Sequence, residues 1–296
     1  MSPLSAPLEF RAPAGLTLRG AVWGEAPRDA VFTHGNGFTV QTYLAALAPL
    51  VPRLSIHGIN LRGHGGSDVP DEFPDWDGPC DDLVAYLRER CRTPALLIGH
   101  SYGATLSLRI AAQHPELAAG LILMEPLVLA GRDEPWPLPS QGHNLRMVTE
   151  AEQRRGRWPS REEAAAWLRS RGSYAGWSDA AFAAFVESAL VPAPGGGMQL
   201  ACPPWLEARG YATLPDAVVF RWADRIRQPA VFLRGDKSLP PAPLEALARV
   251  IPISVVMGLK GTHAFPMEFP AETGRALAAA LDIVLKAEAG GTVHLS

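Results

Sequence analysis

Residues 95–112 read ALLIGHSYGATLSLRIAA, and this stretch decides the fold. It opens with a fully apolar run at 95–98, continues with GHSYG at 99–103, and ends in a segment of helical spacing that extends to Gln113. A short apolar run before a glycine is typical of a strand that is buried on both faces. The stretch therefore predicts a strand, a tight turn at Ser101 and a helix.

The same alternation of strand and helix continues on both sides of this stretch. Strand character appears in a hairpin at residues 8–11 and 16–23, and then at 29–33, 54–59, 118–124, 229–234 and 253–257. Helical spacing appears at residues 40–51, 76–91, 241–250 and 271–286. Parallel strands need crossover connections, and helices in those connections cover both faces of the sheet. We therefore expect an α/β protein with a mostly parallel central sheet flanked by helices.

The alternation stops between residues 128 and 222. This segment has helical stretches, prolines and a GGG run, but no clear strand. Six of the eight tryptophans fall in it or at its edge: Trp136, Trp158, Trp167, Trp177, Trp205 and Trp222. We expect an α/β core at 1–127 and 223–296, interrupted by a helical cap at 128–222 that covers a largely apolar pocket.

Composition excludes several classes of protein. The 296 residues are 47% hydrophobic and 19% charged, so the chain can build a large core. A net charge of −3 provides no basic surface for nucleic acid or for an anionic membrane. No apolar run reaches the roughly 18 residues of a membrane span, and no secretory signal is apparent, so we expect a cytoplasmic protein. Three cysteines without CxxC spacing predict reduced thiols and no metal site.

Ser101 is the candidate nucleophile. The glycines on either side of it permit a strained turn that exposes the hydroxyl, and the following helix contributes positive potential at its N-terminus. A serine hydroxyl needs a base, because it is hardly ionised at neutral pH. His263, in GTHAF at 261–265, follows the strand at 253–257. Strands of a parallel sheet end at one edge, so His263 is expected beside Ser101.

The base in turn needs a carboxylate to orient it, and two candidates follow strands. Glu125 comes directly after the strand at 118–124, and Asp236 comes after the strand at 229–234. Both fit the chain order of serine, acid and histidine.

An oxyanion site requires two preorganised N–H donors. One is expected from Tyr102, the residue after the serine, and the other from Asn36 in the glycine-rich HGNGF loop at 34–38.

These motifs, together with LRGHGGS at 61–67, resemble the α/β-hydrolase family, in particular its capped single-domain serine esterases and lipases. The resemblance covers both halves of the predicted sheet. The family often carries its acid three residues after the glycine that follows the seventh strand. That glycine is Gly235 here, and the position holds Ser238, while Asp236 lies two positions early. Some members place the acid after the sixth strand, where Glu125 stands, so we prefer Glu125 and keep Asp236 as the second choice.

The resemblance implies a serine hydrolase that cleaves a small or medium acyl ester, thioester or lactone through an acyl-enzyme. Its expected partner is a small ester-like molecule, and no cofactor is expected. One alternative is a hydrolase of C–C bonds or a cofactor-free ring-cleaving enzyme that uses the same site. Another is a catalytically idle hydrolase fold that serves as a binding protein. Dehalogenases and epoxide hydrolases of this fold carry an aspartate where this chain has Ser101, which argues against both chemistries.

Overall fold

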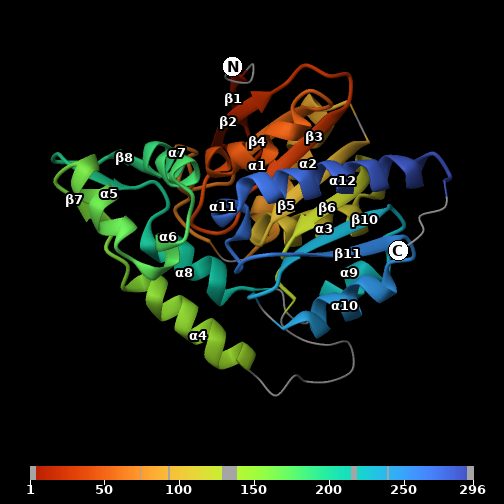
Figure 1. Ribbon diagram of the computed structural model, residues 1–296. Coiled ribbons are helices and arrows are strands. Elements are labelled where there is room, and N and C mark those ends of the chain that lie inside the picture. Colours follow the sequence, from red (N-terminus) through yellow and green to blue (C-terminus); the bar gives the residue numbers. More distant parts are fainter. Residues whose placement is uncertain are drawn as a thin grey trace.

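The central element is an eight-stranded sheet with the strand order β1-β2-β4-β3-β5-β6-β10-β11 (Figure 1). The computed structural model describes residues 5–73, 75–92, 94–128, 139–214, 219–238 and 240–291. The strands are β1 (Ser5–Arg11), β2 (Thr17–Trp23), β3 (Asp29–Thr33), β4 (Ser55–Asn60), β5 (Ala95–His100), β6 (Ala118–Met124), β10 (Ala230–Gly235) and β11 (Ser254–Leu259). β2 pairs antiparallel with β1 and β4, and every other pairing in this sheet is parallel. The predicted fold class is confirmed.

Helices cover both faces of the sheet (Figure 1). One face carries α2 (Asp77–Arg90), α3 (Tyr102–Gln113), α9 (Val219–Ala223) and α10 (Pro241–Val250). The other carries α1 (Leu44–Leu47) and α12 (Pro270–Glu288). Shorter helices are α11 (Phe265–Glu268) and the 3-10 turns η1 (Val40–Tyr43), η2 (Ala48–Leu50) and η3 (Pro115–Leu117).

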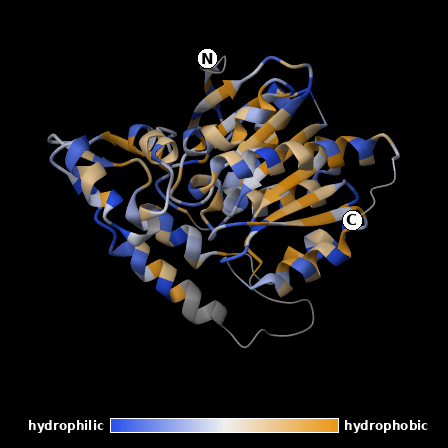
Figure 2. Ribbon diagram, viewed as in Figure 1, coloured by the Kyte–Doolittle hydropathy of each residue, from blue (hydrophilic) through white to orange (hydrophobic). Residues whose placement is uncertain are grey.

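Residues of one strand alternate between two hydrophobic clusters, one on each face. In β5, Leu97 packs into the first cluster and Ile98 into the second, and Val31 and Phe32 of β3 divide in the same way. Successive side chains of a strand point to opposite faces, so a strand buried on both must be apolar throughout. Figure 2 shows the resulting apolar band along the central strands.

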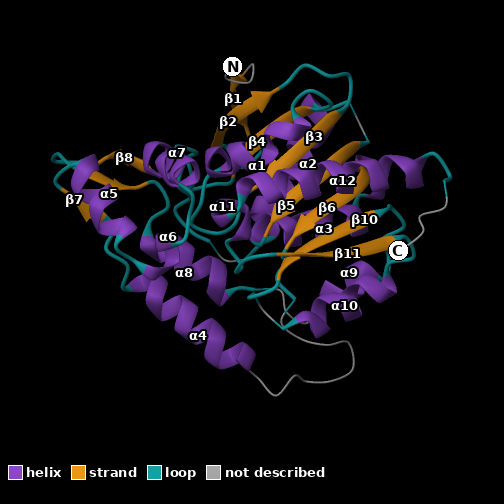
Figure 3. Cartoon of the chain, viewed as in Figure 1, coloured by secondary structure: helices purple, strands orange, loops and turns teal. Residues whose placement is uncertain are grey.

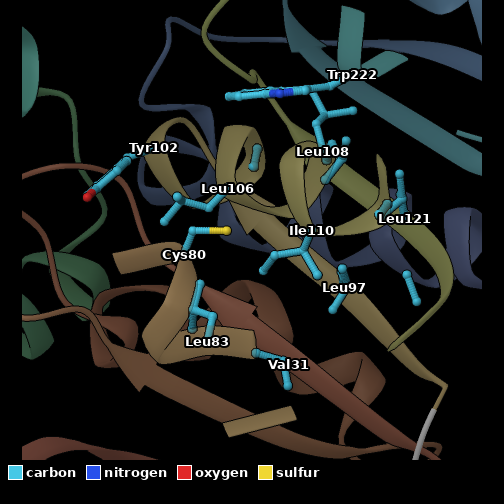
Figure 4. Close-up of a cluster of buried hydrophobic side chains, with 14 of the residues drawn as sticks. Val31, Cys80, Leu83, Leu97, Tyr102, Leu106, Leu108, Ile110, Leu121 and Trp222 are labelled. Carbon is cyan, nitrogen blue, oxygen red and sulfur yellow. The ribbon is translucent and has the colours of Figure 1, made fainter. Parts of the chain in front are cut away.

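The first cluster joins helices that are distant in sequence (Figure 4). Cys80 and Leu83 of α2 meet Leu106 and Ile110 of α3 over the sheet, and Trp222 of α9 closes the cluster. The expected boundary between residues 222 and 223 therefore falls inside α9, a helix that packs on the core against α3 and α10. The chain leaves the inserted segment before α9.

The segment between β6 and α9 is mainly helical and lies to one side of the sheet (Figure 3). Its helices are α4 (Pro139–Glu152), α5 (Arg161–Arg169), α6 (Gly172–Ala175), α7 (Asp179–Ala189) and α8 (Pro204–Ala212). It also holds a small antiparallel sheet of β7 (Arg157–Trp158), β9 (Met198–Leu200) and β8 (Leu190–Pro192), which is separate from the main sheet. The sequence pattern did not predict these strands, because two or three residues are too few to show a period.

Aromatic side chains form the interior of the inserted segment. Trp158 and Trp177 are buried, and the ring of Trp177 packs edge-on against Phe185 and Phe38. Phe38 belongs to the loop after β3, so this packing attaches the segment to the main sheet. Trp205 is exposed. Trp136 lies outside the described residues.

In the described part of the chain, no helix combines the length and the apolar character that crossing a membrane requires.

α12 packs closely against the sheet at Gly120. A Cβ atom at Gly120 in β6 would lie 2.4 Å from Cγ1 of Val284, whereas a Cβ atom at Gly258 in β11 would meet nothing within 4 Å. We predict that Gly120→Ala lowers the free energy of unfolding by about 1–3 kcal/mol through overpacking. Gly258→Ala is the matched control and should leave it unchanged or raise it slightly. Urea unfolding of both variants is the measurement, and equal effects would contradict this account of the packing.

Candidate active site

Ser101 occupies the turn between β5 and α3 with φ 52° and ψ −111°. This conformation is rare for a residue with a side chain and costs on the order of 1–3 kcal/mol. Close backbone packing around the turn maintains it. A Cβ atom at Gly99 would lie 2.5 Å from the Ala104 nitrogen, and one at Gly103 would lie 2.4 Å from the Thr33 carbonyl oxygen. Glycine at both positions is therefore required for this turn.

Glu125 is in the corresponding place on the neighbouring strand. Among the described residues, Ser101 and Glu125 are the two non-glycine residues with positive φ, and φ of Glu125 is 48°. The Ser101 N–H donates to the Met124 carbonyl at 2.9 Å, and the Glu125 N–H donates to the Leu233 carbonyl at 3.0 Å. Hydrogen bonding between β5, β6 and β10 thus continues into both turns and holds the two residues side by side.

The Glu125 carboxylate is buried and accepts three hydrogen bonds. Its Oε1 accepts from the Gly235 N–H at 2.7 Å, and its Oε2 accepts from the Ser238 hydroxyl at 2.6 Å and from Nδ1 of His263 at 3.3 Å. Burial alone would raise the pKa of Glu125, but the hydrogen bonds and the charge of His263 outweigh it and lower that pKa. Glu125 is therefore a carboxylate at neutral pH, next to the imidazole.

Asp236, the second-choice acid, has a different neighbour. Its Oδ1 accepts from the Gly261 N–H at 2.8 Å, so it holds the start of the loop that carries His263. The structure thus brings Glu125, and not Asp236, into contact with the His263 ring. Asp236 instead contacts the backbone of Gly261, two residues before His263. Within the described part of the chain, no hydrogen bond joins Ser101 Oγ to His263. Catalytic hydrogen bonds are often long before substrate binds.

Asn36 lies in the loop between β3 and η1, and its N–H makes no hydrogen bond to the described residues. The neighbouring N–H groups are all engaged: Gly35 with Tyr43 Oη at 3.2 Å, Gly37 with His64 Nε2 at 3.1 Å, and Phe38 with the Gly35 carbonyl at 3.1 Å.

The N–H of Tyr102 is similarly uncommitted. Tyr102 is the first residue of α3, so its N–H has no acceptor within the helix. On either side, Ser101 donates to Met124 and Gly103 donates to His34. The two N–H groups expected to bind an oxyanion are therefore both unpaired in the described structure. The side chain of Tyr102 is buried at the edge of the first hydrophobic cluster (Figure 4).

Three buried histidines hold the loops around the site. In each of them one ring nitrogen donates and the other accepts: His34 donates to the Gly35 carbonyl and accepts from the Leu61 N–H, His64 donates to the Arg62 carbonyl and accepts from the Gly37 N–H, and His100 donates to the His263 carbonyl and accepts from Tyr43 Oη. Burial lowers the pKa of all three, that of His64 to about 4. All three are therefore neutral positioning groups.

A cavity of about 770 Å³ lies between the sheet edge and the inserted segment. Asn36, Leu127, Ser238 and His263 line it from the sheet side. Ser101 does not contribute to this lining and is 6% exposed. Most of the lining surface is apolar, and seven described residues on it carry charges: Arg146, Glu150, Arg154, Arg171, Glu207, Lys237 and Glu268.

Sequence reasoning gave no role to Arg154, Glu207 or Tyr43. Glu207 lies in α8, and its backbone carbonyl accepts a hydrogen bond from Asn36 Nδ2 at 2.8 Å. Its carboxylate pairs with Arg154 at 2.6 Å. The hydrogen bond between Asn36 and Glu207 joins residues that are 171 positions apart in the chain, so no local pattern could have indicated it.

One group of described residues has the ligand types of a metal site. Ligand atoms of Asp29, His57 and Cys91 lie within 4.8 Å of one another. Asp29 begins β3, so the group lies at the end of the sheet away from Ser101. The N–H and guanidinium of Arg92 bind the Asp29 carboxylate at 2.6 and 3.2 Å, which offsets the charge that a cation would require. The group is not part of the candidate active site.

Comparison with known proteins agrees with the observed fold. A family model described as the alpha/beta hydrolase family matches residues 30–276. The chain belongs to that family.

Two curated relatives match part of the chain. A pimeloyl-[acyl-carrier protein] methyl ester esterase of Chromobacterium violaceum is 32% identical over 114 residues, which are 38% of this chain and 42% of that protein. A 2-(acetamidomethylene)succinate hydrolase of Mesorhizobium japonicum is 32% identical over 99 residues, or 32% and 34% of the two chains. The chain thus aligns with about two fifths and one third of the lengths of these relatives.

Solved structures resemble the whole chain. The crystal structure of an E-2-(acetamidomethylene)succinate hydrolase superposes with a TM-score of 0.79 at 22% identity, covering 94% of this chain and all of that one. A thioesterase domain from the curacin biosynthetic pathway superposes with a TM-score of 0.74 at 20% identity, covering 96% of this chain and all of that one. At this level of identity the similarity establishes the fold.

The neutral histidines predict sensitivity to acid. An unfolded chain protonates its histidines near pH 6.5, whereas the folded protein resists protonation of His34, His64 and His100 to lower pH. Stability is therefore present above pH 6.5 and decreases as pH falls towards 4. A shift from 6.5 to about 4 at His64 corresponds to roughly 3 kcal/mol.

Urea unfolding between pH 7.5 and 4.5 measures this effect. His64→Gln keeps an acceptor for the Gly37 N–H but has no proton to gain, so the dependence on pH should become shallower. A wild-type stability that is constant or increases on acidification over this range would rule out neutral buried histidines.

Proposed function

We propose that this protein is a serine hydrolase that cleaves the acyl ester or thioester of a small molecule through an acyl-enzyme. The observation that carries the proposal is the Glu125–His263 hydrogen bond at the sheet edge where the strained turn holds Ser101. Two uncommitted N–H groups, those of Asn36 and Tyr102, flank the same turn. The combination contains a nucleophile, a base, an orienting acid and oxyanion donors.

In the proposed mechanism, Ser101 Oγ attacks the carbonyl carbon while Nε2 of His263 takes the hydroxyl proton. Glu125 accepts a hydrogen bond from Nδ1 of His263, which leaves Nε2 as the basic nitrogen. The N–H groups of Asn36 and Tyr102 stabilise the oxyanion of the tetrahedral intermediate. His263 then protonates the leaving alcohol or thiol, and the ester bond breaks. Water activated by His263 releases the acid and regenerates Ser101.

We further propose that the inserted segment acts as a cap. Arg154, Trp167, Tyr174 and Glu207 of this segment line the cavity opposite His263, so the segment would exclude water from bound substrate. One of its links to the site is the hydrogen bond from Asn36 to the carbonyl of Glu207.

The names of two matched proteins support ester or thioester chemistry, whereas the name of the 2-(acetamidomethylene)succinate hydrolase states neither. One matched protein is an ester esterase, and one structural neighbour is a thioesterase domain. An idle binding protein would have no need to keep a strained serine beside unpaired N–H groups, since both are costly. C–C bond hydrolysis or cofactor-free ring cleavage on the same groups is the remaining alternative, and the tests below measure the turnover of esters.

The first test concerns the nucleophile. We predict that Ser101→Ala lowers kcat on p-nitrophenyl esters by about 10⁵–10⁶-fold while the folded structure persists, because only one hydroxyl is removed. Steady-state kinetics and labelling with a fluorophosphonate probe are the measurements. Ester turnover by the purified variant close to that of the wild type would refute the mechanism.

The second test compares the two carboxylates. Glu125→Gln should lower kcat by about 10²–10⁴-fold, because the amide cannot stabilise the protonated imidazole and favours the wrong tautomer. Asp236→Asn is the matched control, since its amide oxygen still accepts from the Gly261 N–H, and it should lower kcat less than tenfold. Larger loss in the Asp236 variant would reverse the assignment while leaving Ser101 as nucleophile.

A further inference from the structure

The carboxylates that line the cavity are already engaged. Glu150 pairs with Arg146 at 2.7 Å on the surface of α4, and Glu268 accepts from the N–H and the hydroxyl of Thr262 at 2.9 and 2.7 Å. Glu207 pairs with Arg154 at 2.6 Å. Among the described residues, each negative charge on the lining therefore has its own donor.

The cations on the lining are less completely paired. Arg154 uses one of its guanidinium nitrogens for Glu207, and in the part of the chain that the structure describes its other N–H groups have no acceptor. The guanidinium of Arg171 stacks on the ring of Trp167 at 4.3 Å. Neither Arg171 nor Lys237 forms an ion pair with a described carboxylate. Among the described residues, the lining thus carries two cations without an ion pair, Arg171 and Lys237, and one carboxylate without one, Glu268, which Thr262 holds by hydrogen bonds.

Tyr174 adds an unpaired donor beside Arg154. Tyr174 lines the cavity. Its hydroxyl is buried and has no hydrogen-bond partner among the described residues. The whole residue is 3% exposed. A buried hydroxyl without a partner costs about 1–3 kcal/mol, and a ligand carboxylate in the cavity would supply the missing acceptor.

The position of Arg154 places this charge near the reacting group. Glu207, its partner, receives the hydrogen bond of Asn36, whose N–H is the proposed oxyanion donor. A Cβ atom at Gly37 would lie 2.9 Å from the Glu207 carboxyl group, so the ion pair rests directly on the oxyanion loop. Arg154 and Asn36 therefore line the same cavity, and both contact Glu207.

We infer that the substrate carries a carboxylate, which the free N–H groups of Arg154 and the Tyr174 hydroxyl bind, with Arg171 and Lys237 attracting it to the cavity. This inference rests on the proposed function and specifies its substrate class. A planar guanidinium binds a carboxylate through two parallel hydrogen bonds, which suits a short dicarboxylic monoester better than a plain fatty acyl ester. A neutral substrate would leave the same donors buried and unpaired.

The test compares matched esters. The mono-p-nitrophenyl ester of glutaric acid carries the carboxylate in its acyl part, and p-nitrophenyl pentanoate is its neutral counterpart. Acetylated 4-hydroxybenzoate against phenyl acetate places the carboxylate in the leaving group instead. The wild type should prefer the charged member of at least one pair by tenfold or more in kcat/KM. Equal kcat/KM within both pairs would overturn the inference while ester hydrolysis itself stands.

Three variants assign the preference to Arg154. Arg154→Gln should lower the charged-to-neutral ratio of kcat/KM by about 10–100-fold. Arg154→Gln with Glu207→Gln should lower it equally, and this double variant avoids a buried unpaired carboxylate that could unfold the single one. Arg146→Gln is the matched control, because this arginine also lines the cavity but is paired with Glu150 on the surface. An unchanged ratio in the double variant, or an equal fall in the Arg146 variant, would refute the role of Arg154.

Binding separates this inference from the catalytic proposal. Isothermal titration of Ser101→Ala with the two p-nitrophenyl acyl esters reports affinity without turnover. Tighter binding of the glutarate monoester by tenfold or more supports a carboxylate site even if neither ester is hydrolysed by the wild type. Equal affinities for the two esters, with turnover that depends on Ser101 and shows no preference for charge, would leave a serine hydrolase without this specificity.

Discussion

The hydrogen bonds that continue from the sheet into its terminal turns are the constraint on which the site depends. The Ser101 N–H and the Glu125 N–H each bond the carbonyl at the end of the neighbouring strand. Register between β5, β6 and β10 therefore sets the separation of the serine and the glutamate, and a slip of one residue would turn both side chains away from the cavity. The buried core on both faces of the sheet prevents such a slip, so stability and site geometry have the same origin.

Polar groups in the loops after the strands fix the orientation of the side chains whose positions the strand register sets. The Gly235 N–H and the Ser238 hydroxyl hold the Glu125 carboxylate from the β10 side, while Asp236 holds the following loop through Gly261. The Glu125 carboxylate thus holds the ring of His263, and Asp236 holds the backbone of the loop that carries it, so the imidazole is oriented by two separate contacts. Preorganisation of this kind reduces the rearrangement that a reaction requires.

Local patterns in the chain predicted much of this architecture. The apolar strands, the glycine-flanked turn at Ser101 and the positions of Glu125 and His263 after strands follow from runs of three to eight residues, which report burial and backbone freedom directly. Local patterns did not predict three features: the small sheet of the inserted segment, the packing of α9 on the core and the Arg154–Glu207 pair. These depend on contacts between distant residues, and a charged residue on a helix has the same local appearance whether it faces solvent or a cavity.

The bond between Asn36 and the inserted segment has a consequence for how the chain tolerates change. Its acceptor is the main-chain carbonyl of Glu207, which any amino acid would supply. Space is the stricter requirement, because a Cβ atom at Gly210 would lie 2.8 Å from Nδ2 of Asn36. The segment can therefore exchange the side chains that face the cavity, and with them the molecules it admits, as long as the path of its backbone past the oxyanion loop is preserved.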